Sequence, residues 1–140
     1  MSMKSTEVVG GYFVVLAKGE KLIKTLTSFC DARGIQAGSL NGIGAVQNTT
    51  LGYYRLGDKQ YKFKKLNRLL EVVSLTGNVS INKGKVFLHI HAVLSDSKLR
   101  TYGGHLNEAK VGGTLEVFVQ QFNEKFERRP DSDTGLSLIQ

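Results

Sequence analysis

The chain of 140 residues has one cysteine, one proline and three histidines, and no hydrophobic run long enough to span a membrane. Cys30 has no partner within the chain, which excludes an intramolecular disulfide and favours a reducing compartment. The N-terminal apolar run "YFVVLA" is too short for the core of a signal peptide followed by a cleavage site. These absences predict a cytoplasmic protein without a membrane segment.

The composition that remains is that of an ordinary globular domain. Hydrophobic residues make up 41% of the chain and charged residues 22%, both typical values. A chain of this length buries roughly two thirds of its unfolded surface, so it needs no disulfide to be stable. We therefore predict one domain over residues 1–140.

Positive charge is densest in the segment "DKQYKFKKLNR". The net charge of +7 permits binding to nucleic acid or another polyanion without showing it. As a strand, "DKQYKFKKLNR" would place two lysines on one face and Tyr61 and Phe63 on the other. Such a ribbon could contact phosphates. Lysines also protect exposed edge strands from aggregation, and we favour this second interpretation. The candidate nucleic-acid-binding residues are Lys59, Lys62, Lys64, Lys65 and Arg68.

A helix is predicted after a first strand at residues 12–17. The apolar residues that follow Gly19 recur at the spacing of one helix face, and Gly34 then provides a left-handed C-cap. Cys30 on this face is predicted to be a small buried hydrophobe, because nothing near it in sequence would make it a nucleophile. The predicted face comprises Leu22, Ile23, Leu26, Phe29 and Cys30.

Strand patterns separated by glycines dominate the rest. Residues 35–56 are predicted to form two short strands with tight turns or close backbone approaches. Their "NGIGAV" lacks the third glycine and the following helix of a dinucleotide-binding loop. Residues 69–81 and 86–94 are the arms of a long hairpin around "NKGK". A short strand ends at the glycine pair of "LRTYGGHL", and "GGTLEVFVQQF" is a last strand.

One helix among about seven strands joined by short turns predicts an α+β fold. Its sheet would be largely antiparallel, with one face packed against the helix. The polar tail, "NEKFERRPDSDTGLSLIQ", would be partly disordered or would dock its "LSLI" segment on a neighbouring subunit.

Two of the three histidines are one residue apart in the most apolar strand, "VFLHIHAVLSD". Side chains two apart in a strand share a face, so His89 and His91 can both reach one metal ion with bonds of about 2.0–2.1 Å. His105 would complete the set from a turn that Gly103 and Gly104 make possible. A fourth position would hold water or a ligand. The pattern leaves open the alternative of three ordinary hydrogen-bonded histidines.

Zinc is the metal that best suits three neutral nitrogens with one open position, although nickel, copper and iron also accept imidazole. Binding requires neutral histidine, so we expect affinity to fall below about pH 6.5. Glu116, opposite Leu115 and Val117 in the last strand, would orient a ligand or act as a general base in an enzyme. It could equally be a solvated glutamate.

At these segments the chain resembles a known family. "GEKLIKTLTSFCDARGIQAGSLNGIGAVQNTTLGYY", "LLEVVSLTGNVS", "FLHIHAVLSDSKLRTYGGHL" and "GGTLEVFV" follow one another in this order. They closely resemble the PPC (plants-and-prokaryotes-conserved) domain, in its stand-alone prokaryotic type. The same domain is also found in plant AT-hook nuclear-localised proteins. The similarity covers about residues 8–121 and leaves residues 122–140 as a C-terminal tail.

The resemblance implies an α+β homotrimer. In plant relatives a separate AT-hook with an Arg-Gly-Arg-Pro core contacts DNA, whereas this chain has "ERRPD" at residues 127–131, without the glycine. Some stand-alone prokaryotic relatives resemble metal-binding proteins through H-x-H and G-G-H, which match His89, His91 and His105. No reaction is established for the family, so the resemblance supplies no enzyme activity.

Three functions follow from these observations. The first is a trimeric module that holds a metal or small ligand and acts through partner proteins or DNA. The second is a zinc enzyme in which the three histidines hold the metal, a bound water is activated and Glu116 assists proton transfer. The third is a sequence-independent DNA-binding protein that uses the positive charge of three chains. We rank them in this order.

Overall fold

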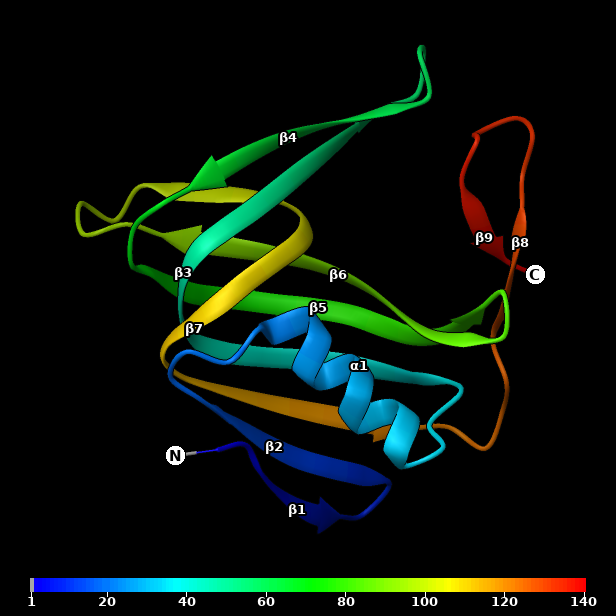
Figure 1. Cartoon of the computed structure of the whole chain (residues 1–140), viewed down its shortest axis with the longest axis horizontal. Helices are drawn as coiled ribbons and strands as arrows, with labels where there is room; N and C mark the ends of the chain where they lie inside the picture. The colour runs from blue at the N-terminus through cyan, green and yellow to red at the C-terminus, as the bar shows by residue number, and fades with distance from the viewer. Residues whose placement is uncertain (1) are drawn as a thin grey trace.

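The computed structural model describes residues 2–140, in which nine strands and one helix are formed (Figure 1). All strand pairs are antiparallel except β5 with β8. This confirms the α+β class with a mostly antiparallel sheet. The elements are β1 (Lys4–Val8), β2 (Gly11–Ala17), α1 (Leu22–Ala32), β3 (Gly38–Arg55), β4 (Gln60–Leu66), β5 (Leu70–Asn82), β6 (Lys85–Ser95), β7 (Thr101–Gln121), β8 (Glu127–Pro130) and β9 (Ser137–Ile139).

Four of the strands close into a ring. β3 pairs with β5, β5 with β6, β6 with β7, and β7 again with β3. β1 and β2 extend the sheet beyond β7, and β4 pairs with β3 beside the ring. The apolar interior is filled by fully buried side chains, among them Leu16, Leu26, Leu40, Leu75, Ile90, Leu94 and Leu115. With 11 residues, the described helix is too short to cross a membrane.

The helix forms as its apolar spacing predicts. Leu22, Leu26, Phe29 and Cys30 are buried, and burial raises the pKa of the Cys30 thiol to about 12, so this cysteine packs as a small hydrophobe. At the C-terminal end, Gly34 has a φ of +65°. The amides of residues 34 and 35 donate to the carbonyls of residues 31 and 30, which is a Schellman cap.

Two predictions of short strands were wrong. Residues 35–56 contribute one strand of 18 residues, β3, and the segments around Gly103 and Leu115 belong to one strand of 21 residues, β7. The pairing of β3 shifts register between Gly42 and Gly44, and Gly44 has a φ of +148°, so an irregularity bends the strand without ending it. In both strands glycine allows close backbone approach rather than a turn.

The long hairpin of β5 and β6 confirms the predicted arms. Its turn residues Lys83 and Gly84 both have positive φ, +51° and +75°, as a two-residue type I′ turn requires. This turn sets the register that pairs Asn78 with His89 and Thr76 with His91.

The C-terminal tail differs from both predictions made for it. β8 and β9 form an antiparallel hairpin, and β8 pairs in parallel with the end of β5 (Figure 1). The "LSLI" segment therefore pairs within its own chain. Its hairpin also reaches the β3–β4 hairpin, because the Tyr54 hydroxyl donates to the Thr134 carbonyl at 2.6 Å and Lys59 Nζ donates to the Ser132 carbonyl at 2.6 Å.

Candidate metal centre

The alternation of β6 places two histidines side by side outside the core. Leu88, Ile90 and Ala92 are buried, whereas His89 is partly exposed and His91 is exposed. This is the two-residue period expected of a strand with one face in the core. The sequence therefore predicted correctly on which face of the strand both imidazoles lie.

His105 joins them from within a strand, not from a turn as predicted. It lies in β7 directly opposite His91 in the β6–β7 pairing, and opposite Gly52 of β3 on its other side. A Cβ on Gly104 would lie 2.8 Å from the Gly52 carbonyl oxygen, so a larger residue would force the two backbones apart. Gly104 thus lets β3 approach the strand that carries His105.

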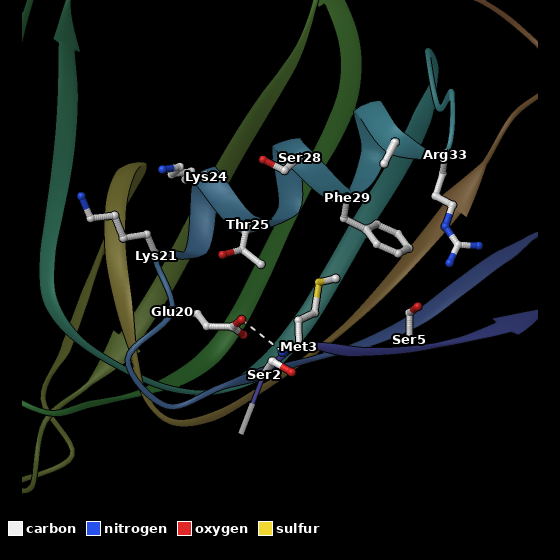
Figure 2. A pocket seen from close by; sticks show the side chains of 11 residues that line it. Ser2, Met3, Ser5, Glu20, Lys21, Lys24, Thr25, Ser28, Phe29 and Arg33 are labelled. Carbon is white, nitrogen blue, oxygen red and sulfur yellow. Dashed lines mark hydrogen bonds between the residues drawn. The ribbon is translucent and has the colours of Figure 1, made fainter.

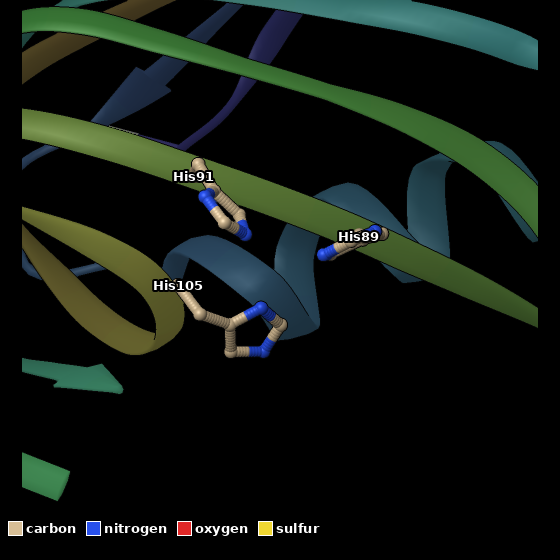
Figure 3. A group of neighbouring side chains, drawn as sticks. All are labelled: His89, His91 and His105. Carbon is tan, nitrogen blue, oxygen red and sulfur yellow. The ribbon is translucent and has the colours of Figure 1, made fainter. Parts of the chain in front are cut away.

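The three imidazoles converge on one space (Figure 3). Their ring centroids are 5.1 Å apart for His89 and His91, 5.3 Å for His89 and His105, and 5.6 Å for His91 and His105. One nitrogen from each ring lies within 4.8 Å of those of the other two. Ligand nitrogens on a tetrahedral zinc ion lie about 3.3 Å apart, so small side-chain rotations would bring the set to bonding distance.

The surroundings of His89 and His105 favour the neutral form of these two rings. Burial lowers the pKa of His89 to about 4, with further lowering by His105, His91 and Arg128. Burial and His91 also lower the pKa of His105. Neutral imidazole is the form that binds a metal.

His105 offers a further sign that the site fits a cation. Its Nδ1 atom is buried and has no hydrogen-bond partner in residues 2–140. Buried nitrogens of this kind are normally satisfied. A metal ion bound by the three rings would satisfy it, so the residues present fit a metal of the imidazole-binding type.

An aromatic wall lies beside the histidines. The ring of Tyr61, on β4, is 5.0 Å from that of His105 and is stacked at 5.3 Å on Phe63. Tyr54 of β3 lies 4.9 Å from Tyr61 on the far side. Tyr61 and Phe63 occupy the face of β4 opposite Lys62 and Lys64, as alternation predicted, but nothing in their spacing linked them to His105.

Arg128 flanks the site from the C-terminal hairpin. Its guanidinium lies 5.0 Å from the centre of the Phe87 ring. Its Nε donates to Ser80 Oγ at 2.8 Å, and an Nη donates to Asn78 Oδ1 at 2.9 Å. Because Asn78 is the cross-strand partner of His89, the guanidinium lies on the same sheet face as the histidines. The sequence did not indicate a role for Arg128 at this site, because it lies in a tail predicted to be partly disordered or docked on a neighbouring subunit.

Glu116 does not belong to the histidine cluster. It pairs with Val15 and Ile43 in the part of β7 that lies between β2 and β3. It borders a hollow of about 290 Å³ lined mainly by the apolar side chains of this sheet face. Among the exposed large hydrophobic residues are Ile43, Val73 and Phe118, at 59%, 54% and 51% exposure.

The basic segment does not form one continuous surface. Lys62 and Lys64 share a face with Tyr53, around a hollow of about 390 Å³ that Tyr102 also lines. Arg68 lies over the Tyr102 ring at 5.0 Å. Two lysines depart from this face: Lys59 is bonded to the C-terminal hairpin, and Lys65 alternates to the other side of β4.

A groove of about 710 Å³ runs between α1 and the N-terminal strand (Figure 2). Lys21, Lys24 and Arg33 border it, and the Glu20 carboxylate accepts hydrogen bonds from the Met3 and Ala17 amides. None of the three histidines lines this groove. It is therefore a feature separate from the candidate metal centre.

Together, the mostly antiparallel sheet, the single described helix and the three converging histidines define an α+β protein with a candidate metal centre on a β-hairpin. The chain belongs to the Plants and Prokaryotes Conserved domain family, abbreviated PCC or PPC, whose model matches residues 3–123. This confirms the resemblance that the motifs indicated.

Two solved structures share this fold over nearly the whole chain. A candidate DNA-binding protein from Bacteroides thetaiotaomicron is 31% identical, with a TM-score of 0.96 over 100% of this chain and 98% of that one. A metal-containing protein from Archaeoglobus fulgidus is 35% identical, with a TM-score of 0.86 over 99% of this chain and 96% of that one.

A similar segment also occurs as part of a longer curated relative. The bifunctional protein GlmU of a Synechococcus strain is 31% identical over 127 residues, which cover 89% of this chain and 19% of that protein. The chain thus spans about a fifth of the length of the curated relatives it matches.

Proposed function

We propose that this protein is a metal-binding module whose His89, His91 and His105 hold a divalent transition metal, with zinc as the first choice. The observation that carries the proposal is the convergence of three imidazole nitrogens within 4.8 Å of one another. The buried, unpartnered Nδ1 of His105 supports it, as does the similarity to a metal-containing protein of Archaeoglobus fulgidus.

The metal would supply a Lewis-acidic centre with one coordination position for water or a ligand. The protein side chains would hold it on the outside of the hairpin, where His91 is exposed and solvent has access. Analysis of bound metals by mass spectrometry, on protein prepared without a histidine tag, tests the proposal. We expect about one zinc per chain, and protein that binds neither zinc nor cobalt or nickel after dialysis against them would refute it.

The same proposal includes assembly into a homotrimer. The sheet face away from α1 exposes large apolar side chains, among them Ile43, Val73 and Phe118, and such patches are typical of protein interfaces. Three-fold closure is what the family resemblance implies. The occupant of this face would be a second copy of the chain.

DNA association is a second candidate, supported by a different observation. Lys62, Lys64 and Arg68 gather around a hollow that Tyr53 and Tyr102 also line, and basic residues with exposed aromatic rings are typical of nucleic-acid-binding surfaces. The similarity to a candidate DNA-binding protein agrees with this assignment. A gel-shift assay with duplex and single-stranded DNA at low salt tests it.

The alternative of a zinc enzyme that uses Glu116 is not part of the proposal. Glu116 lies against β2 and β3 and not among the histidines. Its position instead suits the proposed subunit interface, because it borders the same hollow as Ile43 and Phe118.

A further inference from the structure

The histidine site carries positive charge that no protein carboxylate offsets. In residues 2–140, no Asp or Glu belongs to the histidine cluster, and none lies within 4 Å of the Arg128 guanidinium. A divalent metal held by three neutral imidazoles would add two positive charges beside this arginine. A partly buried cation is normally paired with an anion, so an anionic ligand is expected at this site.

Arg128 is held in a fixed orientation. Besides its bonds to Ser80 and Asn78, an Nη donates to the Ser137 carbonyl at 2.9 Å, and its plane lies over the Phe87 ring. A guanidinium has five N–H donors. Three bonds leave two donors for a ligand, and the side chain would lose little conformational entropy when it binds one.

Two structural observations place this guanidinium beside the metal position. Its hydrogen-bond partner Asn78 lies opposite His89 on the neighbouring strand. The hairpin that carries Arg128 also accepts a hydrogen bond from Tyr54 at the Thr134 carbonyl, and the Tyr54 ring lies 4.9 Å from that of Tyr61, which is itself 5.0 Å from His105. The histidines, Tyr61 and Arg128 therefore border one space.

We propose that this site binds a small organic carboxylate, with one oxygen on the metal and the other on Arg128. The inference rests on the proposed metal site. A carboxylate has two oxygens, so one can bind a metal while the other accepts a charge-assisted hydrogen bond from an arginine. The aromatic wall of Tyr61 and Phe63 would pack against the apolar part of such a molecule, which inorganic phosphate lacks. The phenol of Tyr61 adds one more hydrogen-bonding group to the site.

Cobalt absorption spectroscopy can test this directly. The metal-free protein is dialysed against Co²⁺ and is then titrated with benzoate. The visible absorption of bound Co²⁺ depends on its ligands. We expect benzoate to change the cobalt spectrum with saturation, and benzyl alcohol, which has the same ring without the carboxylate, to cause no change. Inorganic phosphate should be at least about tenfold weaker than benzoate, and a phosphate response without a benzoate response would overturn the carboxylate assignment.

Variants of two neighbouring arginines provide the matched comparison. Arg128→Gln should weaken benzoate about tenfold or more, since it removes a charge-assisted hydrogen bond worth about one unit in log affinity, while cobalt content stays at about one per chain. Arg129→Gln, at the exposed neighbouring position, should leave benzoate affinity unchanged. Equal benzoate affinity in both variants would overturn the role of Arg128.

Arg128 also ties the C-terminal hairpin to β5, so folding is monitored by circular dichroism. If Arg128→Gln unfolds, Arg128→Lys keeps the charge but loses the two-donor fork, and Tyr61→Phe removes only the phenol oxygen. Both should bind benzoate more weakly than the unchanged protein does while retaining cobalt, and unchanged benzoate affinity in both would overturn the inference. Failure to bind cobalt at all would contradict the metal site itself, whereas bound cobalt without a benzoate response would contradict only this inference.

Discussion

His91 and His105 are cross-strand partners in the β6–β7 pairing, and their rings lie edge to face at 5.6 Å. Two paired strands therefore fix two of the candidate ligands against each other through backbone hydrogen bonds. His89 enters from the same strand as His91, two residues away. The candidate site is thus built on the regular geometry of a hairpin and not on a loop.

Removal of two ligands should abolish metal binding without unfolding the protein. The double change His89→Ala and His91→Ala takes away two of three nitrogens, so bound metal should fall from about one per chain to near zero. Both side chains lie outside the core, so the circular dichroism spectrum should be retained. Thr76→Ala, opposite His91 on β5, is the control and should keep the metal; a metal content unaffected by the double change would contradict the assignment.

Metal retention should extend below pH 6.5, the pKa of free histidine. Burial and the neighbouring rings lower the pKa of His89 to about 4, and the pKa of His105 is lowered in the same direction. A lowered pKa means that fewer protons compete with the metal as pH falls. Dialysis at stepped pH followed by metal quantification should give half-loss below pH 6.5. Half-loss at or above that pH would contradict the expectation.

The same lowered pKa values predict how the metal-free protein responds to acid. Between about pH 6.5 and pH 4 the unfolded chain takes up a proton at His89 and the folded chain does not. The lowered pKa of His105 acts in the same direction, so the free energy of unfolding should decrease as pH falls through this range. Urea denaturation at several pH values, with the double histidine variant as the control, measures the effect. In the variant, the free energy of unfolding should decrease less over the same pH range.

The glycine pair before His105 should show two different sensitivities. Gly104→Ala places a Cβ 2.8 Å from the Gly52 carbonyl oxygen, whereas a Cβ on Gly103 would find its nearest neighbour at 3.6 Å. We expect Gly104→Ala to cost about 1–3 kcal/mol of stability and to weaken metal binding by displacing His105. Gly103→Ala should change both only slightly. Urea denaturation and metal titration measure the stability and the metal affinity of the two variants. Equal losses in both variants would contradict the expectation.

The trimer should depend on the exposed apolar sheet face. Phe118→Asp places a charge in the proposed interface, so light scattering should report a lower mass than the three chains expected of the unchanged protein. Leu99→Asp is the control, because Leu99 is 84% exposed in the turn between β6 and β7. A monomer in the unchanged protein at micromolar concentration would refute the assembly.

DNA binding, if present, should use one face of β4. Lys62→Glu with Lys64→Glu should abolish a low-salt gel shift, whereas Lys59→Glu with Lys65→Glu makes the same charge change away from that face and should weaken it less. Each phosphate contact contributes about −0.9 to the slope of log affinity against log salt on duplex DNA. Equal losses of DNA binding in the two double variants would indicate that binding depends on net charge alone and not on one face of β4.

The sequence predicted those parts of the fold and the site that depend on local periodicity. The helix face, the β5–β6 hairpin and the shared face of His89 and His91 all follow from spacings of two to four residues. Glycines misled the prediction, because the pair Gly103 and Gly104 looks like a turn but lies within β7, where Gly104 allows close packing against β3. The exposed strand β1, all of whose residues are solvent-exposed, carries no apolar pattern and was not predicted.

Arg128 was missed for a different reason. Its contact with the site depends on the parallel pairing of β8 with the end of β5, which joins distant parts of the chain. The polar composition of residues 122–140 gives no periodic signal for such docking. Only the tertiary arrangement shows that this arginine, Tyr61 and the histidines border one space.

The closure of β3, β5, β6 and β7 into a ring has a consequence for the order of folding. The three histidines lie within residues 89–105 of two adjacent strands, so they can meet after only a short loop is closed. The ring itself requires pairs such as Gly38 with Gln121, whose loop closure is far more costly in entropy and slower. Metal ligands would thus assemble before the barrel-like ring is complete. A divalent ion present during refolding should then speed the formation of β6–β7 contacts while leaving the final, ring-closing phase at its own rate.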